Sequence, residues 1–266
     1  MGVVNLTPDS FSDGGDHQTP DAACHHAHQL IKDGAAILDL GAESTRPHAT
    51  PVPPTEERAR LLPVLQALVA ESPGADIGAH ISVDTRNPET IIAAAKITPV
   101  IWNDVTALTH HPDSAAVAAD LACPIILMHA GQHFQGMPSP PDNSDIVQQV
   151  CETLSTRVDV ALAAGVKPEA ICLDPGIGFG KGTEDNLRLL RHLDQLLVLG
   201  FPVLVGASRK RFIDALSPSP EAKRRLAGSL VAHLAAIAGG AQIIRTHDVF
   251  ETRQAVAVHQ ALQAIS

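Results

Sequence analysis

The chain has 266 residues and a formal net charge of −10 at pH 7, with 45% hydrophobic and 18% charged residues. The apolar content excludes an intrinsically disordered chain, and the acidic balance argues against a protein that binds nucleic acid or an anionic membrane. The length fits either nearly two average domains or one α/β domain of about 250 residues.

Eight short apolar runs recur along the chain, and a helical pattern follows each of them. The predicted strands cover 3–6, 36–40, 81–83, 100–102, 124–128, 171–173, 202–205 and 242–244. The predicted helices cover 21–33, 55–71, 88–96, 114–121, 145–164, 186–199, 221–238 and 249–265. Near-continuous apolar strands are typical of a parallel sheet with helical crossovers, because both faces of such a sheet are buried. The sequence therefore predicts an α/β fold, a (β/α)8 TIM barrel that forms a single domain over residues 1–266.

We expect a cytoplasmic protein with no membrane span. The uncharged stretch 226–244 contains His233 and the pair Gly239–Gly240, which favours a helix, a glycine break and a strand over a membrane helix. Met1 leads directly into the first predicted strand, so we expect no secretory signal. The four cysteines lie far apart and form no Cys-x-x-Cys motif, as expected of small buried side chains in a reducing compartment.

A polar or charged side chain lies at or just after the end of every predicted strand. In chain order these side chains include Asn5, Asp39, Asp84, Asn103, His129, Asp174, Lys210 and Arg245. A barrel brings the C-terminal ends of all its strands to one mouth, so side chains from the whole length of the chain would share one site. Strand ends are also polar because they approach solvent, but solvent exposure explains one or two such residues rather than a full set.

The charges at these strand ends are mixed. Four basic side chains gather there in an acidic chain: Arg46, Lys210, Arg245 and His247. Such a group suits a phosphorylated ligand. Asp84, Asn103 and Asp174 suit a flat heterocycle with an amidine-like donor edge, because a carboxylate accepts two parallel N–H bonds. Any one of these aspartates, taken alone, could instead form a salt bridge to a neighbouring arginine.

The segment 176–182 is rich in glycine but matches no nucleotide-binding motif. A P-loop requires Ser or Thr after the lysine, and here Gly182 follows Lys181. The Gly-x-Gly-x-x-Gly spacing of a dinucleotide site is absent as well. The interpretation that we favour is a loop whose missing side chains let a substrate lie against the backbone, with Phe179 as an apolar wall.

Eight motifs follow one another along the chain. They are MGVVNLTPDSFSDGG at 1–15, DLGAESTRP at 39–47, SVDTR at 82–86, NDV at 103–105, LMH at 127–129, LDPGIGFG at 173–180, GASRK at 206–210 and RTHD at 245–248. Together they resemble the motifs of the dihydropteroate synthases over essentially the whole chain. The resemblance implies a homodimeric TIM barrel that uses Mg²⁺. It also implies the reaction: 4-aminobenzoate condenses with 6-hydroxymethyl-7,8-dihydropterin diphosphate to give 7,8-dihydropteroate and pyrophosphate in folate synthesis.

The resemblance also implies roles for individual residues. The pterin ring would be held by Asp84, Asn103, Asp174 and Lys210, with Met128 and Phe179 as apolar neighbours. The diphosphate would contact Thr45, Arg245 and His247, and the protein ligand of Mg²⁺ would be Asn5. The 4-aminobenzoate would lie near Ser208, beneath two closing loops that carry Phe11, Arg46 and Pro47. Three of these residues are the catalytic candidates: Asp84, Asp174 and Lys210.

Two departures from the family pattern concern the loops. His48 stands where a glycine is common, and the loop after His129 is longer than usual. Two alternatives also stay open. A methyltetrahydrofolate-dependent methyltransferase barrel shares the Asp/Asn platform but has no use for a diphosphate clamp. A catalytically silent barrel would be expected to have lost Asn5, Lys210 or Arg245, and all three are present.

Overall fold

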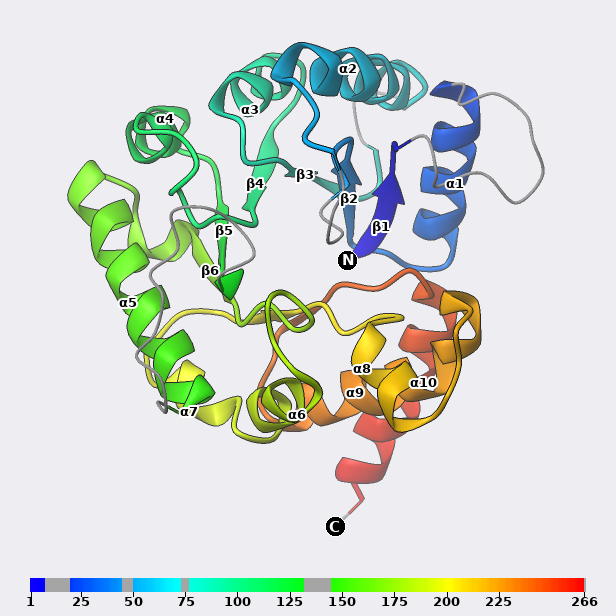
Figure 1. The fold of residues 1–266 in the computed structure, drawn as a ribbon. Helices are drawn as coiled ribbons and strands as arrows, with labels where there is room; N and C mark the ends of the chain where they lie inside the picture. Colours follow the sequence, from blue (N-terminus) through cyan, green and yellow to red (C-terminus); the bar gives the residue numbers. More distant parts are fainter. Residues whose placement is uncertain (8–19, 45–49, 73–76, 132–144, 266) are drawn as a thin grey trace.

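The computed structural model describes residues 1–7, 20–44, 50–72, 77–131 and 145–265. In this part of the chain, eight parallel strands alternate with helices (Figure 1). The strands are β1 Gly2–Asn5, β2 Ile37–Gly41, β3 His80–Asp84, β4 Val100–Asp104, β5 Ile125–Met128, β6 Ile171–Asp174, β7 Leu204–Val205 and β8 Ile243–Ile244. Each of them overlaps one of the predicted apolar runs.

The strands join into a closed wall. β1 to β6 form one parallel sheet in chain order, and β7 and β8 form a second. The Leu173 N–H donates to the Pro202 carbonyl at 2.8 Å, and the Val3 N–H donates to the Thr246 carbonyl at 3.1 Å. These bonds link the sheets at both edges. The predicted (β/α)8 TIM barrel is confirmed, while its extension over all of 1–266 as one domain stays a prediction.

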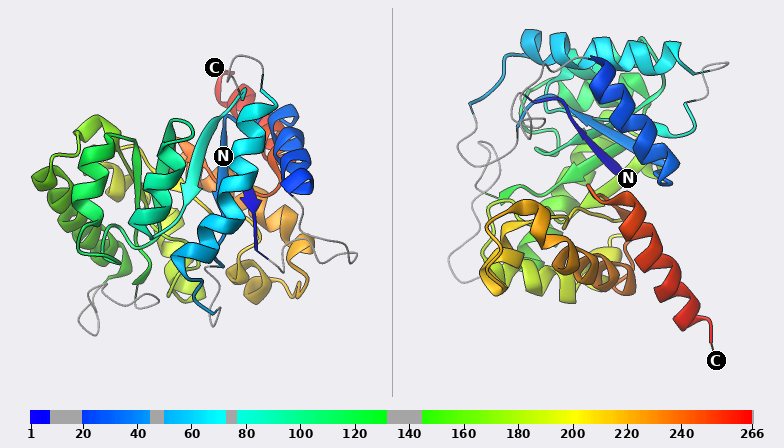
Figure 2. Two further views of the ribbon diagram at one scale, coloured as in Figure 1. Left: turned by 90° about the horizontal axis from the view of Figure 1, so that it is seen from above. Right: turned by 90° about the vertical axis from the view of Figure 1, so that its right-hand side faces the viewer.

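Helices surround the strands on the outside of the barrel (Figures 1 and 2). Within the described residues they are α1 Pro20–Lys32, α2 Pro54–Ala70, α3 Pro88–Ala95, α4 Ser114–Leu121, α5 Ile146–Ala164, α6 Thr183–Arg191, α7 Asp194–Leu197, α8 Arg211–Leu216, α9 Leu226–Ala238 and α10 Val249–Gln263. Short 3₁₀ turns cover Pro168–Ala170 and Ala222–Arg225. Ten of these segments are α-helical, two more than the pattern predicts.

The two additional helices have separate causes. The predicted helix 186–199 breaks at His192, whose backbone leaves the helical region, and the break allows Leu190 of α6 and Leu196 of α7 both to be buried. The helix α8 has only six residues, of which Phe212 and Ile213 are buried. A segment of that length is too short to show a helical period.

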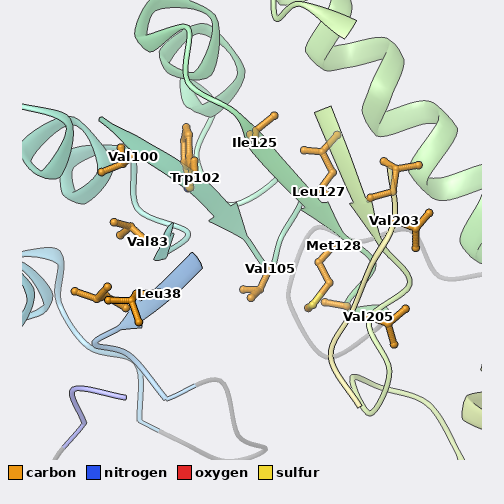
Figure 3. Packing of buried hydrophobic residues seen from close by; sticks show 14 of the residues in the cluster. Leu38, Val83, Val100, Trp102, Val105, Ile125, Leu127, Met128, Val203 and Val205 are labelled. Atoms are coloured by element: carbon orange, nitrogen blue, oxygen red, sulfur yellow. The ribbon is translucent and has the colours of Figure 1, made fainter. Parts of the chain in front are cut away.

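Apolar side chains of the strands form the core. Figure 3 shows Trp102, Ile125 and Leu127 of β4 and β5 within this cluster. Trp102 is fully buried, and its indole N–H donates to the Thr85 carbonyl at 2.7 Å, so the one polar group of the side chain is satisfied. Each fully buried Leu or Ile contributes about 1.5–3 kcal/mol. This packing fixes the strands and therefore the polar residues at their ends.

No helix of the described segments combines the length and the apolar character that a membrane crossing needs. The uncharged stretch 226–244 consists of α9, a turn in which Gly240 has a φ of 97°, and β8, as predicted. All four cysteines are free thiols: Cys24, Cys123, Cys151 and Cys172.

Candidate active site

The strand register brings the predicted site residues to one end of the barrel, which we call the mouth. Asn5 of β1 pairs with Gly41 of β2, which in turn pairs with Asp84 of β3. Asp84 pairs with Asn103 of β4. On the other side of the wall, Met128 of β5 pairs with Asp174 of β6. Residues far apart in sequence are therefore neighbours in the mouth, as predicted.

Arg245 lies between two carboxylates. Its Nε atom donates to Asp39 Oδ2 at 2.6 Å, and its Nη2 atom donates to Asp84 Oδ2 at 3.0 Å. The Asn103 amide nitrogen lies 3.3 Å from both Asp39 oxygens. No role in binding or catalysis was predicted for Asp39. The position of Asp39 at the end of a predicted strand indicates that it lies at the mouth. Which carboxylates bind Arg245 depends on side-chain geometry across the barrel, which the sequence does not show.

The charges in this cluster shift one another. Burial, and then the charge of Asp39, raise the pKa of Asp84 to about 7, against the lowering effect of Arg245. Burial acts to lower the pKa of Arg245. The charges of Asp39 and Asp84 outweigh this effect and raise the pKa above its ordinary value. The arginine is therefore always charged, and when both carboxylates are ionised they carry one more negative charge than it neutralises. A ligand with N–H donors would compensate the remainder.

Asp174, Lys210 and Phe179 form the opposite side of the mouth. The Lys210 Nζ atom lies 3.9 Å from the centroid of the Phe179 ring, in a cation–π contact. Burial lowers the pKa of Lys210 to about 8, and Arg245 acts in the same direction while Asp174 opposes it. Gly178 has a φ of 81°, and a Cβ atom there would lie 2.8 Å from Lys210 Cδ, so the lysine stem needs a glycine at this position.

Asp174 and Met128 are both buried at the ends of their strands. One carboxylate oxygen of Asp174 accepts a hydrogen bond from the Gly176 N–H at 2.7 Å. Burial raises the pKa of Asp174, and this backbone bond and the charge of Lys210 oppose the rise. Asp174 is thus held by the glycine-rich segment that follows it.

Ser208 and His247 are hydrogen-bonded to each other. Ser208 Oγ lies 3.0 Å from His247 Nδ1 and accepts a bond from the His247 backbone N–H at 3.2 Å. The hydroxyl of Thr246 lies 3.5 Å from Ser208 Oγ and 3.1 Å from the hydroxyl of Thr252 on α10. The loops that follow β7 and β8 are therefore joined at the mouth, and helix α10 is joined to them.

Two predicted substrate residues, Thr45 and Arg46, lie outside the described residues, as do Phe11 and Pro47. One further charged pair, Arg86 with Glu43, was not predicted. Arg86 donates to both carboxylate oxygens of Glu43, at 2.6 and 3.0 Å, just behind the strand ends. Both residues belong to motifs of the sequence, but the sequence does not show that their side chains pair.

The described residues contain no group of three or more His, Cys, Asp or Glu side chains that could hold a metal ion. Asn5, half-buried at the end of β1, offers a single amide oxygen. One hard oxygen ligand fits Mg²⁺, which keeps waters and takes substrate phosphates as its other ligands, and does not fit a metal enclosed by protein.

Comparison with known proteins extends the likeness to the whole fold. The family described as "Pterin binding enzyme" matches residues 1–247. The dihydropteroate synthase of Synechocystis sp. is 43% identical over 98% of this chain and 89% of its own length. The structure of Xanthomonas albilineans dihydropteroate synthase with 4-aminobenzoic acid matches with a TM-score of 0.91 at 44% identity, covering 100% of this chain and 93% of that one. The complex of the X. albilineans enzyme with 7,8-dihydropteroate matches with a TM-score of 0.88 at 43% identity, over 100% and 93% of the two chains.

Proposed function

The chain belongs to the pterin-binding enzyme family, and on this basis we propose that it is a dihydropteroate synthase. It joins 4-aminobenzoate to 6-hydroxymethyl-7,8-dihydropterin diphosphate and releases pyrophosphate. The observation that carries the proposal is the charged mouth. There, Arg245 bridges Asp39 and Asp84, while Asp174 and Lys210 lie on the opposite side.

We propose that the pterin ring lies between these two sides. Asp84 and Asp174 would accept hydrogen bonds from the N–H groups of the ring, and Asn103 would supply both a donor and an acceptor. Met128 and Phe179 would contact its apolar surfaces, and Lys210 would donate to a ring acceptor. Burial of both carboxylates supports this assignment, because a buried carboxylate without enough donors gains most from a ligand that supplies them.

The diphosphate would bind beside the pterin. Arg245 keeps Nη1 outside its two carboxylate contacts, and His247 lies at the end of β8 on the same loop. With Thr45, these groups would neutralise the charge that develops on the leaving oxygen. Asn5 would be the protein ligand of Mg²⁺, which supplies further neutralisation of the phosphates when bound.

The reaction exchanges one bond at the pterin methylene carbon. The amine nitrogen of 4-aminobenzoate forms a bond to that carbon, the bond to the diphosphate oxygen breaks, and the electron pair leaves with pyrophosphate. The nitrogen then loses one proton to solvent. Positive charge that builds on the methylene spreads into the pterin ring, where Asp84 stabilises it. Removing such a group should cost about 3 kcal/mol of transition-state stabilisation.

We further propose that the 4-aminobenzoate carboxylate lies near Ser208 and that Arg46 takes part in binding it. The Ser208 hydroxyl is fixed by His247, so the two substrates would contact one connected group of side chains. Replacing Arg46 with alanine should then raise the KM for 4-aminobenzoate with little effect on the pterin substrate.

We propose that the molecule is a homodimer. Helix α10 carries three exposed large apolar side chains, at positions that fall on one helical face: Phe250, Val258 and Leu262. Ile265, just after the helix, is exposed as well. The C-terminal half of α10 extends away from the barrel (Figures 1 and 2). An apolar stripe on a projecting helix is costly in water, and a second copy would cover it. A cytoplasmic location agrees with the four free thiols.

The test is a pyrophosphate-release assay with both substrates, combined with binding of the pterin diphosphate alone. Asp174→Ala and Lys210→Ala should abolish pterin binding, whereas Lys167→Ala, at an exposed position before β6, should bind normally. Near-normal turnover by either mouth variant would reject the assigned roles. Methyl transfer from methyltetrahydrofolate without pyrophosphate release would favour the alternative methyltransferase.

A further inference from the structure

One lysine, Lys181, binds the backbone of the glycine-rich segment 176–182 from within. The Lys181 ammonium donates to three backbone carbonyls: Gly176 at 2.9 Å, Phe179 at 3.1 Å and His129 at 2.8 Å. An ammonium group has three donors and no acceptor, so these bonds use its full capacity. Two of the carbonyls belong to the loop that follows β6, and the third belongs to the loop that follows β5.

The two loops approach so closely that no side chain could stand between them. Gly176 has a φ of 67°, and a Cβ atom there would lie 1.9 Å from the His129 carbonyl oxygen. The carbonyl oxygens of Gly176 and His129 also lie close together, because both bind the Lys181 Nζ atom. Such groups need a donor, and an unpaired buried carbonyl costs about 1–3 kcal/mol. Lys181 donates to both, and the Phe179 N–H also donates to the Gly176 carbonyl at 3.1 Å.

The same loop is anchored at a second point. Asn186 of α6 accepts a bond from the Gly178 N–H at 2.6 Å and donates to the Gly182 carbonyl at 2.6 Å. Lys181 and Asn186 together fix a segment that has no regular secondary structure. Burial lowers the pKa of Lys181 to about 7, and the charge of Asp174 opposes this change. Burial therefore disfavours the charged form of the group that these bonds hold in place.

Each carbonyl bonded by Lys181 lies next to a side chain of the pterin site. His129 follows Met128, the Gly176 N–H binds Asp174, and Phe179 itself faces Lys210. We propose that Lys181 is a positioning residue for the pterin pocket. It holds the Phe179 ring and the backbone of Gly176 where the pterin needs them, without contacting substrate. This inference rests on the proposed function. It assigns to Lys181 an indirect role, through the backbone and the Phe179 ring that line the pocket.

The test is Lys181→Met, which keeps the length and apolar stem of the side chain and removes its donors. We expect the KM for the pterin diphosphate to rise about tenfold, while kcat and the KM for 4-aminobenzoate stay near the wild-type values. Hydrogen exchange at the Gly178 and Phe179 amides should become faster. Lys167→Met, at an exposed position, is the matched control and should match the wild type in both measurements. If Lys181→Met fails to fold, Lys181→Gln, which keeps two donors, takes its place.

Three results would decide the matter. Wild-type KM together with wild-type exchange at 176–180 would overturn the inference. A fall in kcat with an unchanged pterin KM would also overturn it, because it would place Lys181 in the chemistry. If the wild type releases no pyrophosphate but Lys181→Met still shows faster exchange, the proposed function is rejected. The role of Lys181 in fixing the loop is then still supported.

Discussion

Asp39 and Asp84 share a single guanidinium inside the mouth of the barrel. Arg245 bonds both carboxylates, but Asp39 is fully buried and Asp84 nearly so, and burial penalises each negative charge. The pKa of Asp84 rises to about 7 for this reason. Because burial opposes the ionised form of Asp84, a ligand that donates hydrogen bonds to this carboxylate would stabilise it.

Replacing Asp84 with Asn should therefore trade function for stability. The folded-state pKa of Asp84 lies above its unfolded value, so the wild-type free energy of unfolding falls as pH rises from about 4 to about 7. An asparagine at this position does not titrate, so the Asp84→Asn variant does not lose stability in this way. Between pH 5 and pH 8, we expect its free energy of unfolding to rise by about 1–2 kcal/mol relative to that of the wild type. Urea denaturation at the two pH values measures the difference.

The same variant should lose pterin binding. A stability difference that does not change with pH would show that Asp84 is already ionised at pH 5, contrary to the expected shift. Asp113→Asn, at an exposed position before α4, is the control and should follow the wild type at both pH values.

The identities of the mouth residues could be predicted because the strand register alone brings them together. Asn5, Asp84 and Asn103 follow from three apolar runs and a parallel sheet. The pairing of Arg245 with Asp39 could not be predicted, because residues 206 positions apart in sequence meet only through side-chain conformation. Lys181 escaped for a related reason: its partners are carbonyls, which every residue possesses and no sequence pattern marks.

At the scale of elements, α2 and α3 are joined through a buried acid. Glu57 of α2 is completely buried, and its Oε2 atom accepts bonds from the Asn87 side chain at 2.9 Å and from the Thr90 hydroxyl at 2.5 Å. Burial raises the pKa of Glu57, while these donors oppose the rise. Asn87 also donates its N–H to Thr85, so Glu57 supports the loop that follows Asp84.

Glu57→Ala should destabilise the protein by about 2–3 kcal/mol, because it leaves two buried donors without an acceptor. Glu57→Gln keeps the volume and one acceptor and should cost about 1 kcal/mol. Glu56→Ala is the matched control: Glu56 is exposed and, among the described residues, forms an ion pair with Arg60 one turn later, so its loss should cost less than about 0.5 kcal/mol. Chemical denaturation measures all three, and equal losses at positions 56 and 57 would contradict the buried role.

The elements themselves were largely predictable, since eight apolar runs and eight helical patterns coincide with what the barrel contains. The region 186–199 was predicted as one helix because its leucines recur at helical spacing. The break at His192 reflects the space available beneath α6 and α7, a tertiary constraint that local periodicity does not record.

At the scale of the whole molecule, the exposed stripe of α10 should hold two copies together. Val258→Glu and Leu262→Glu place charges on that stripe and should convert a dimer into a monomer. Sedimentation equilibrium should give a wild-type mass near twice 27.9 kDa and a variant mass near 27.9 kDa. Val198→Glu, on a similarly exposed apolar residue at the end of α7, should leave the dimer intact. A monomeric wild type would contradict the proposal.

The contact between β1 and the end of β8 governs when the site can exist. The Val3 N–H donates to the Thr246 carbonyl, and the Thr246 N–H donates to the Met1 carbonyl at 2.9 Å, so the first and the eighth strand complete the wall. A ribosome adds Asn5 to the chain long before it adds Arg245. Until then β1 has an open edge and Asp39 and Asp84 have no counter-charge. A nascent chain should therefore be unable to retain substrate, and the capacity to do so should arise in a single step, when the final strand docks.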